Sequence, residues 1–349
     1  MPLSSPLMNS AISSNAFSFD TKDFLISFEN YLSDITVRFD HSVKDLVEHV
    51  VVGGGKRIRP LLVYTCGAGK TASIKNLLKA STVIEMVHVA TLVHDDILDN
   101  AELRRNKPTL HSKFGEHTSI LLGDALFSFA LELATDFPGS NVCRIVSRAT
   151  RKTCTGEINQ TFHKENYELS ADEYFSIIQD KTGELFQASC SLGAYLGGLN
   201  QNLIDLAGDF GVSLGLNYQI YDDLIDTFGN NFAFGKTLGS DLKAGKLTLP
   251  VIRLLEILPI EECASLKSDF KHENFNTEFM KYLGELFIVH NIHDLCFSEL
   301  ESRLSNSKLI ASNIPDRELS ARLTSFISSF DSKLANLATN LLPNFLALN

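Results

Sequence analysis

The chain has 349 residues, 44% of them hydrophobic and 21% charged, enough apolar material for one large core or two smaller ones. Its 31 Lys and Arg against 42 Asp and Glu give a net charge of −11, without a long basic block, so no nucleic-acid partner is expected. Six cysteines at irregular spacings, with no Cys-x-x-Cys pair, argue against a zinc site or a disulfide framework and indicate a reducing cytoplasm.

The N-terminal segment differs from the rest of the chain. Residues 1–18 are rich in Ser and contain no Lys or Arg, so they lack the basic region of a signal peptide and the Arg enrichment of a transit peptide. We expect them to be a disordered extension. Helical periodicity dominates from Thr21 onward, with almost no alternating strand pattern and no linker, which predicts one all-α domain over residues 19–349.

The first helical pattern covers Asp23 to Val51, as one or two amphipathic helices. It is followed by Gly-Gly-Gly-Lys-Arg-Ile-Arg-Pro, from Gly53 to Pro60, where Pro60 suits the first turn of the next helix. Glycines let the backbone approach an anion, and the three cations beside a helix N-terminus favour phosphate. The alternative is a flexible, solvated basic loop. The stretch does not have the spacing of a Walker A loop.

The next pattern, Ala80 to Asp99, is an apolar helix that ends in Asp95, Asp96 and Asp99. Carboxylates at i, i+3 and i, i+4 share a helix face and repel one another by roughly 0.2 to 0.5 kcal/mol per pair, so a counter-charge is expected. By itself this run could be a solvated acidic patch. The helix, about 30 Å long, could cross a bilayer by length, but its ionisable residues argue against a transmembrane segment.

Arg104 and Arg105 follow the acidic run directly, before Lys107. Because the planar guanidinium matches phosphate oxygens, this pair suggests a polyphosphate bridged between Arg and a metal ion; an ordinary surface pair is the alternative. Apolar helices are predicted over Ser119–Thr135, Asn141–Gln160 and Tyr174–Leu199. The last one carries Lys181 and Thr182 near its middle, where a Lys is more often a surface residue whose stem covers apolar groups.

A second acidic run repeats the spacing of the first. Asp222, Asp223 and Asp226 end the apolar helix predicted over Gly208–Phe228. Two carboxylate clusters that face one another would hold hard divalent cations, and Mg²⁺ takes a few carboxylates together with phosphate oxygens and water. A Gly-rich loop then places Lys236 and Lys246 where both could reach one anion, and the final stretch from Leu334 to Asn349 is apolar and low in charge.

Taken in order, these motifs resemble the trans-isoprenyl diphosphate synthases, the polyprenyl synthetase family. The resemblance covers about Gly54 to Pro250 and implies an antiparallel helix bundle around a deep central cavity, usually in a homodimer. The motifs that carry it are Gly-Gly-Lys-Arg-Ile-Arg-Pro, Glu-Met-Val-His, His-Asp-Asp-Ile-Leu-Asp, Leu-Arg-Arg-x-Lys-Pro-Thr, Lys-Thr, Gln-Ile-Tyr-Asp-Asp-Leu-Ile-Asp and Gly-Lys-Leu-Thr-Leu-Pro.

The resemblance also implies residue roles in condensing isopentenyl diphosphate with an allylic diphosphate. Isopentenyl diphosphate would be held by Lys56, Arg59, His88 and Arg105. The allylic diphosphate would bind through Mg²⁺ to Asp95, Asp96, Asp99, Asp222, Asp223 and Asp226, assisted by Arg104, Lys181, Lys236 and Lys246. Thr182 and Gln219 would orient or stabilise the cationic region. The product is water-insoluble, so a peripheral contact with a membrane is expected although the protein has no transmembrane segment.

Product length is expected to depend on the helix below the first acidic run. A chain anchored at Asp95 would pass Thr91 and Ala90, then Val87 and Met86 one turn deeper. Short-chain members of the family place a bulky aromatic residue at the position of Ala90, so a product longer than geranylgeranyl diphosphate is predicted. Its floor would be built by Met86, Val83, Phe127 and Leu131. The alternative is that Ala90 merely packs against a neighbouring helix in a farnesyl or geranylgeranyl diphosphate synthase.

Two other interpretations remain open. A class I terpene cyclase shares the fold, but its second metal motif combines Asn or Asp with Ser or Thr and Glu, unlike the second run here. A catalytically silent subunit of a heteromeric synthase tends to lose acidic motifs, and this chain has both. Two departures from the family pattern are Tyr218, where Phe is common, and the sixteen residues after Lys333 that contain no Lys or Arg, which puts closure by a basic tail in doubt.

Overall fold

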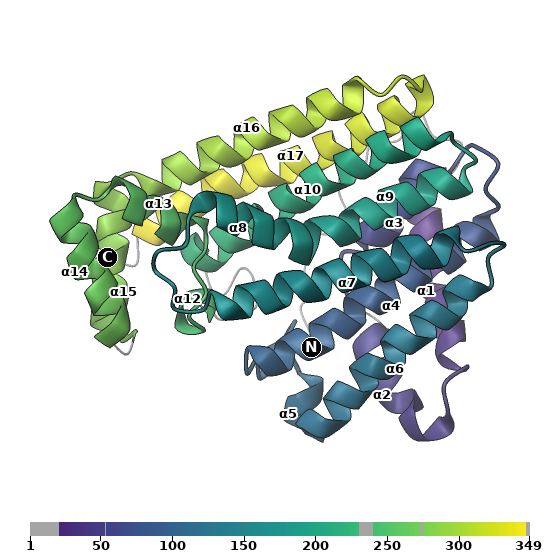
Figure 1. The fold of residues 1–349 in the computed structure, drawn as a ribbon, viewed down its shortest axis with the longest axis horizontal. Coiled ribbons are helices and arrows are strands. Elements are labelled where there is room, and N and C mark those ends of the chain that lie inside the picture. The colour runs from purple at the N-terminus through teal and green to yellow at the C-terminus, as the bar shows by residue number, and fades with distance from the viewer. Residues whose placement is uncertain (1–20, 53, 230–239, 273–274, 347–349) are drawn as a thin grey trace.

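The computed structural model describes residues 21–52, 54–229, 240–272 and 275–346 (Figure 1). The extension predicted over residues 1–18 and the predicted ligand Lys236 lie outside the described residues. The helical elements are α1 (Thr21–Thr36), α2 (His41–Val51), α3 (Ile58–Gly67), α4 (Ile74–Leu98), α5 (Leu110–Phe114), α6 (Glu116–Thr135), α7 (Asn141–Phe162), α8 (Ala171–Ile178), the π-helical turn η2 (Gln179–Gly183), α9 (Glu184–Leu196), α10 (Gln201–Phe228), α12 (Ser240–Lys243), α13 (Leu249–Ile257), α14 (Ile260–His272), α15 (Thr277–Val289), α16 (Ile292–Ser312) and α17 (Arg317–Leu346).

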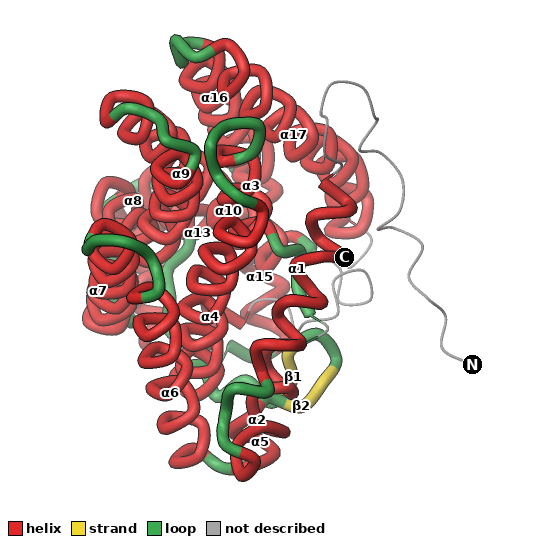
Figure 2. Tube along the Cα trace, turned by 90° about the vertical axis from the view of Figure 1, so that its right-hand side faces the viewer, coloured by secondary structure: helices red, strands yellow, loops and turns green. Residues whose placement is uncertain are grey.

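The predicted all-α class is confirmed. In the described part of the chain the strands are two short ones, β1 (Leu103–Arg104) and β2 (Lys107–Pro108), which pair antiparallel as a hairpin. Figure 2 shows this hairpin beside α2, with helices making up nearly all of the rest. Short connections join α3 to α4, α6 to α7, α9 to α10 and α16 to α17, so these neighbours run antiparallel.

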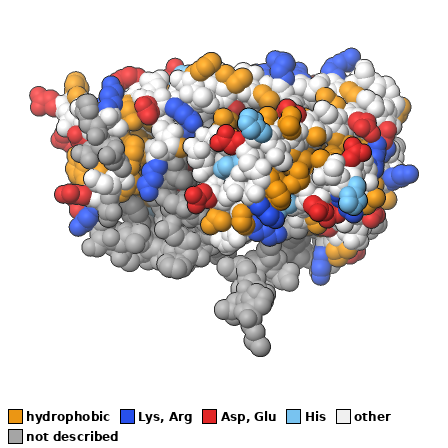
Figure 3. All heavy atoms as spheres, turned by 90° about the horizontal axis from the view of Figure 1, so that it is seen from below, with side chains coloured by type: hydrophobic (Ala, Val, Ile, Leu, Met, Phe, Trp, Pro, Cys, Tyr) orange, Lys and Arg blue, Asp and Glu red, His pale blue; other side chains and the backbone are white. Residues whose placement is uncertain are grey.

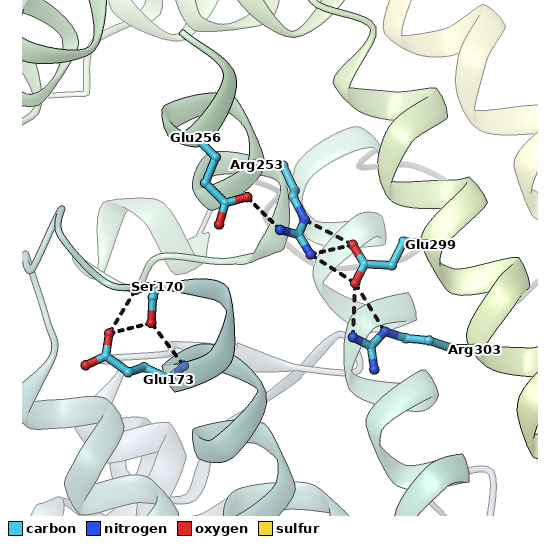
Figure 4. Close-up of polar contacts among 6 residues, drawn as sticks. All are labelled: Ser170, Glu173, Arg253, Glu256, Glu299 and Arg303. Atoms are coloured by element: carbon cyan, nitrogen blue, oxygen red, sulfur yellow. Dashed lines mark hydrogen bonds and ion pairs between the residues drawn. The ribbon is translucent and has the colours of Figure 1, made fainter. Parts of the chain in front are cut away.

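Polar side chains fix where the long helices begin. The Ser73 hydroxyl accepts the backbone N–H of Asn76 at the start of α4, and Asn200 does the same for Leu203 at the start of α10. At the start of α8, Ser170 and Glu173 form a capping box, in which each side chain bonds the other residue's backbone N–H (Figure 4). These caps set the register with which each helix delivers its functional residues.

Helix α9 is the centre of the bundle. Leu185, Ala188 and Leu192 belong to a core shared with α1, α4, α6 and α7, whereas Phe186 and Cys190 belong to a core shared with α10, α13, α16 and α17. A helix that is apolar on both sides is buried between layers. Figure 1 accordingly shows α9 between α10 and α3. At Gly193 a side chain would overlap the backbone of Val63, so glycine allows α3 and α9 to pack closely.

A polar network ties three helices together beside this core. Arg253 of α13 donates three hydrogen bonds to Glu299 of α16, two from Nη2 at 2.8 and 3.1 Å and one from Nε at 3.0 Å (Figure 4). Glu256 accepts a further hydrogen bond from Arg253 Nη1. Arg303, one turn further along α16, also donates to Glu299, and its guanidinium lies 3.8 Å from the centre of the Phe175 ring in α8. The network therefore holds α8, and with it η2, against α16.

One predicted helix differs from the structure. The pattern over Asp23–Val51, predicted as one or two helices, forms two, which the short segment between Thr36 and His41 separates. The helix predicted over Tyr174–Leu199 is interrupted by η2, because the chain there makes a wide π-helical turn at Lys181 and Thr182. π-Helical turns are rare in proteins overall, and those that occur often lie at functional sites.

Two helices pass a length and composition test for crossing a membrane, α4 and α6. In α4, 72% of the most apolar 18-residue stretch is buried inside the fold, which identifies α4 as an interior helix. In α6, 44% of the corresponding stretch is buried. Charged residues at the C-terminal end of α4 were the reason for not expecting a membrane span there, and its burial agrees with that expectation.

Candidate active site

The first acidic run lies at the C-terminal end of α4. Asp95 and Asp96 occupy its last turn, and Asp99 is the C-cap residue, whose backbone N–H bonds the Asp95 carbonyl at 2.9 Å. Each of two carboxylates has a cationic partner. The Arg104 Nε donates to Asp96 at 2.7 Å, and the Lys246 Nζ lies 2.6 and 2.7 Å from the two oxygens of Asp99. The counter-charges that the sequence required are therefore an arginine of β1 and a lysine more than a hundred residues away.

Asp95 faces a second set of charges from α7 and η2. Lys181 forms an ion pair with Glu157 and donates to the Gln160 side chain at 2.9 Å. Burial raises the pKa of Asp95 to about 7, helped by the charge of Glu157 and opposed by that of Lys181. Burial acts to lower the pKa of Lys181, but Asp95 and Glu157 outweigh it and raise that pKa. Glu157 and Gln160 are functional candidates that the sequence analysis did not assign, although their i, i+3 spacing puts both on one face of α7.

The second acidic run occupies the last two turns of α10, and its middle residue, Asp223, has neutral donors. Asp223 is buried, and accepts hydrogen bonds from the Tyr174 hydroxyl at 2.6 Å and from the Gln219 amide at 2.8 Å. Thr182 in turn donates to the Gln219 carbonyl oxygen at 2.7 Å. Burial and the charge of Asp241 raise the pKa of Asp223 to about 8, against the two hydrogen bonds, which lower it.

The turn η2 links the two acidic runs. Its Lys181 is placed toward Asp95, and the next residue, Thr182, bonds through Gln219 to Asp223. At Gly156 of α7 any side chain would overlap the backbone of Lys181, so glycine lets α7 approach η2 closely. Two successive residues of this wide turn are therefore directed at different carboxylate runs, Lys181 at the first and Thr182, through Gln219, at the second.

Asp226, the third residue of the second run, is almost completely buried, with 2% of its surface exposed. Its Oδ2 accepts the backbone N–H of Asp241 at 3.3 Å, at the start of the short helix α12. The Asp241 carbonyl also accepts the backbone N–H of Lys246 at 2.9 Å, so the loop that carries Lys246 is anchored to the second run while its side chain reaches the first. Asp241 was not predicted as a site residue, because it belongs to no motif with a recognisable spacing.

The predicted isopentenyl diphosphate ligands form a basic pocket between α3, α4 and the hairpin. Arg59 Nη1 donates to His88 Nε2 at 3.1 Å; because Arg can only donate, the ring proton of His88 lies on Nδ1. Burial, followed by the charges of Arg59 and Arg104, holds the pKa of His88 well below its usual value, so the ring is neutral. The Nε–H of Arg59 is buried and has no hydrogen-bond partner among the described residues, as expected of a donor that awaits an anion.

The hairpin turn directs the two arginines to different places. Arg105 and Asn106 both have positive φ, 52° and 61°, as the central residues of a type I′ turn require. Arg104 contacts the first acidic run, whereas the Arg105 guanidinium packs against Gly54 and Gly55, where a Cβ would meet it. Gly55 has φ +107°, a conformation suited to glycine. Burial, with the charge of Arg104, lowers the pKa of Arg105.

Lys56 lies at the aromatic side of the same pocket. Its Nζ is 5.7 Å from the ring centres of both Tyr218 and Tyr221 of α10, within cation–π range, and the Phe330 ring of α17 lies 6.0 and 5.6 Å from those two rings. Arg59 similarly lies 4.6 Å from the centre of the Phe186 ring. The Lys56, Arg59, His88 and Arg105 side chains are thus brought together, next to the first acidic run.

The predicted chain-length residues lie in the core of α4. Met86 and Ala90 are fully buried and Val87 is 1% exposed, while the Thr91 hydroxyl is half-buried and bonds the His88 carbonyl at 2.7 Å. One residue of the predicted floor of the product pocket is wrong. Leu131 is 42% exposed on the outer face of α6, and other apolar residues of this helix form its buried face. Phe127 is half-buried, 5.8 Å from the His94 ring.

Two small cavities lie beside the acidic residues. One, of about 60 Å³, is lined by Asp226, Leu242 and Thr248 with residues of α15. The other, of about 10 Å³, is lined by Tyr174, Lys246 and their neighbours. Neither is lined by Met86, Val87 or Ala90, whose side chains are packed against other residues.

The donor chemistry of the acidic runs fits a hard divalent cation. All the donors are carboxylate oxygens, which Mg²⁺ and Ca²⁺ prefer, and burial disfavours the charge of both Asp95 and Asp223 as long as no cation neutralises it. Among the described residues no three His, Cys, Asp or Glu side chains are already grouped as a metal site. Because Arg104 and Lys246 pair with Asp96 and Asp99, a cation at the first run would compete with them for these carboxylates.

Comparison with known proteins agrees with this site. Residues 40–286 match the polyprenyl synthetase family. The chain is 34% identical over 251 residues to the short chain isoprenyl diphosphate synthase of Methanocaldococcus jannaschii, a match that spans 71% of this chain and 76% of that protein. It is 36% identical over 222 residues to heptaprenyl diphosphate synthase component 2 of Bacillus subtilis, spanning 63% of this chain and 64% of that protein.

Solved structures show the same likeness. A polyprenyl synthase from Caulobacter crescentus, complexed with calcium and isoprenyl diphosphate, superimposes with a TM-score of 0.81 at 28% identity, over 88% of this chain and 94% of that one. A decaprenyl diphosphate synthase from Rhodobacter capsulatus gives a TM-score of 0.81 at 25% identity, over 90% of this chain and 99% of that one.

The fold is that of the all-α isoprenoid synthases. The chain belongs to the polyprenyl synthetase family and is a trans-prenyltransferase, whose relatives include both short-chain and long-chain synthases.

Proposed function

We propose that the protein is a Mg²⁺-dependent synthase that condenses isopentenyl diphosphate head-to-tail with an allylic diphosphate to an all-trans product longer than geranylgeranyl diphosphate. The observation that carries this proposal is the arrangement around η2. Lys181 there is placed toward the first acidic run and Thr182 is bonded through Gln219 to the second, while Lys246 spans both. One diphosphate between the runs would meet carboxylate-bound metal and lysine together.

The residue roles follow from this arrangement. Mg²⁺, when bound, would supply positive charge that stabilises the departing allylic diphosphate. We assign its ligands to the two runs, Asp95, Asp96, Asp99, Asp222, Asp223 and Asp226. Lys181, Lys246 and Arg104 would bind the same diphosphate, with Lys236 as a further candidate. The similar Caulobacter crescentus enzyme was crystallised with calcium and isoprenyl diphosphate, which supports a diphosphate with a divalent cation as ligands of this fold.

Isopentenyl diphosphate would occupy the neighbouring basic pocket. The unpaired Nε–H of Arg59, the neutral ring of His88 and the buried guanidinium of Arg105 would bind its phosphate oxygens, and Lys56 would close the aromatic side. A neutral His88 can donate a hydrogen bond to a phosphate oxygen without adding a further positive charge to those of the neighbouring basic residues. Thr182 and Gln219 would orient the allylic carbon, and the apolar walls would exclude water from the carbocation.

The assay that tests the proposal uses purified protein with Mg²⁺, isopentenyl diphosphate and each allylic primer, followed by sizing of the products. Linear products that grow by five carbons support a synthase, cyclic hydrocarbons without use of isopentenyl diphosphate support a terpene cyclase, and no turnover supports a silent subunit. The second outcome or the third would contradict the proposal.

The long product is the finer part of the proposal, and it rests on Ala90. A small side chain at this position leaves room below the first acidic run, whereas its complete burial is the observation in favour of a short-chain enzyme. We expect Ala90→Phe to shorten the product when farnesyl diphosphate and excess isopentenyl diphosphate are supplied. Ala134→Phe, at a buried alanine of α6, is the matched control for added volume. An unchanged product distribution in Ala90→Phe would remove this residue from the pocket wall.

We also propose a homodimer in the cytoplasm. Helix α6 exposes Ile120, Leu121 and Leu131, with 44%, 68% and 42% of their surfaces accessible. Figure 3 shows the molecule from below, where orange apolar side chains gather between charged ones. The six free thiols suit a reducing compartment. Light scattering on the purified chain would test the dimer; a monomer that gains activity with a second component, as the name of the Bacillus subtilis relative implies for that protein, would contradict it.

A further inference from the structure

Arg57 differs from the two basic residues beside it in the glycine-rich loop. Lys56 is exposed and Arg59 lies in the basic pocket, but Arg57 is buried, with 5% of its surface accessible, and its guanidinium is used by protein groups. It forms a bidentate pair with Glu29, at 2.7 Å from Nε and 3.2 Å from Nη2, and Nη1 donates to Glu85 at 2.6 Å. Together with a bond to the Val51 carbonyl, protein groups take four of its five N–H donors, which separates it from the substrate ligands.

These bonds join three elements around the basic pocket. Glu29 belongs to α1, and Glu85 belongs to α4, one turn before His88. A further bond from Arg57 Nη2 to the Val51 carbonyl, at 2.9 Å, fixes the end of α2. Arginine's planar fork suits such simultaneous contacts, which a lysine could not reproduce.

The backbone of Arg57 shows why the turn needs this support. The residue is the N-cap of α3 and has φ 48°, ψ 37°, a left-handed conformation that is uncommon for an L-residue with a long side chain. Residues held in such conformations persist only when their surroundings over-determine them. The left-handed residue lies between Lys56 and Arg59, so it sets the directions in which these two side chains leave the loop.

We propose that Arg57, together with Glu29 and Glu85, is a positioning triad for the isopentenyl diphosphate pocket, through which α1 controls the affinity of that pocket. The inference rests on the proposed function. Glu29 and Glu85 would act through Arg57, and Arg57 through the loop that carries Lys56 and Arg59. Glu85 has a second effect, since its charge raises the pKa values of Arg59 and Arg105 against the burial that lowers both.

Glu29 gives the cleanest test, because its side chain is 40% exposed and Arg57 retains Glu85 as a counter-charge when Glu29 is neutralised. In Glu29→Gln we expect the apparent KM for isopentenyl diphosphate to rise by roughly tenfold, the factor that matches loss of about 1.4 kcal/mol. The KM for the allylic primer and kcat should be nearly unchanged. Asp34→Asn, an exposed carboxylate of the same helix, is the matched control and should leave all three parameters as in the wild type.

A double mutant separates positioning from general stability. In an Arg59→Ala background, Glu29→Gln should add little to the KM for isopentenyl diphosphate, because residues that act through one group are not additive. Arg57→Lys should show the same selective effect as Glu29→Gln, or a larger one. Equal changes in both KM values, or a lower melting temperature with an unchanged KM, would assign the triad to stability alone and overturn the inference.

Binding without turnover distinguishes this inference from the proposed function. Titration calorimetry with isopentenyl diphosphate, in EDTA, reports on the basic pocket of wild type, Glu29→Gln and Asp34→Asn. A wild type that binds isopentenyl diphosphate but makes no product contradicts the proposed reaction, while a weaker affinity in Glu29→Gln still supports the triad. Equal affinity in all three proteins would contradict the triad even if the enzyme is active.

Discussion

The two acidic runs have the same spacing at the ends of two apolar helices, but different surroundings. The first is neutralised by side-chain cations, Arg104 on Asp96 and Lys246 on Asp99. In the second, neutral donors hold the buried Asp223, which accepts from Tyr174 and Gln219, and a backbone N–H donates to Asp226. A carboxylate of this motif can therefore be stabilised by a cation, as Asp96 and Asp99 are, or by neutral hydrogen-bond donors, as Asp223 is. We expect a metal ion to displace cations at the first run and to stabilise the charged form of Asp223 at the second.

The largest expected effect is on turnover. Asp95→Ala and Asp222→Ala should each reduce kcat by about 10²- to 10³-fold, the size of effect found when a single group that stabilises transition-state charge is removed. Initial rates with saturating substrates and Mg²⁺ test this, and circular dichroism checks that the helices are intact. Asp209→Ala, at an exposed position of α10, is the control. Near-normal turnover in either variant would show that its run does not bind the reacting diphosphate.

Tyr174→Phe tests the neutral stabilisation of the second run. Removing the hydroxyl leaves the buried Asp223 with one donor fewer. Because the pKa of Asp223 is about 8, this carboxyl is mostly protonated at pH 7, and a hydrogen bond between neutral groups contributes about 0.5 to 1.5 kcal/mol, so the free energy of unfolding should fall by that order. Urea denaturation of the metal-free protein measures it. Tyr282→Phe, at a tyrosine of α15 that is 43% exposed, should have little effect. A loss that is equal in both variants would mean that Tyr174 does not support Asp223.

Lys246→Gln tests the charge stabilisation of the first run. Removing the lysine frees Asp99, and an ion pair of this kind contributes about 1 kcal/mol, so Mg²⁺ should bind roughly fivefold more tightly in the absence of substrate. The same variant should turn over more slowly, because the lysine would also bind the allylic diphosphate. Calorimetric titration with MgCl₂ measures the first effect. Weaker Mg²⁺ binding than in the wild type would contradict the displacement of Lys246 by metal.

Stability should also depend on pH. Asp95 and Asp223 have pKa values of about 7 and 8 in the folded protein, above the usual 3.8, so the folded state binds their protons more tightly than the unfolded state. Their contribution is complete below pH 4 and is lost as the pH rises through 7 to 8. Without metal, the free energy of unfolding should fall over this window by up to about 1.4 kcal/mol per pH unit for each group.

Thermal unfolding in EDTA between pH 5 and 8 measures this dependence. Asp95→Asn and Asp223→Asn should each flatten part of it, because a neutral amide has no proton to lose. Added Mg²⁺ should flatten it as well, since the ion stabilises the charged carboxylates. A stability that rises over the same pH range in EDTA would show that both carboxylates are ionised in the folded protein.

Much of this site could be predicted from the sequence, because the information lies in local patterns. The helical repeat placed Asp95 and Asp222 at helix ends, and the basic loop before Pro60 was correctly put at a helix N-terminus. The direct contacts could not be predicted. The family resemblance placed Lys246 near the acidic runs, but its ion pair with Asp99 and the bond from Tyr174 to Asp223 depend on the packing of distant helices. Nothing local distinguishes buried Arg57 from exposed Lys56. Leu131 was placed on the wrong side of α6, because an apolar stripe on both faces of a helix does not identify the inner one.

The wide turn at Lys181 and Thr182 has a consequence for the packing of this helical segment. The buried residues Tyr174, Ile178, Thr182 and Phe186 recur every four positions, whereas an ordinary α-helix turns once in 3.6 residues and would carry such a row progressively around its axis. The π-helical turn absorbs one extra residue, so both halves keep their apolar rows toward the same neighbours. Lys181 and Thr182 can therefore be directed at the site while the apolar packing on either side of the turn stays in register.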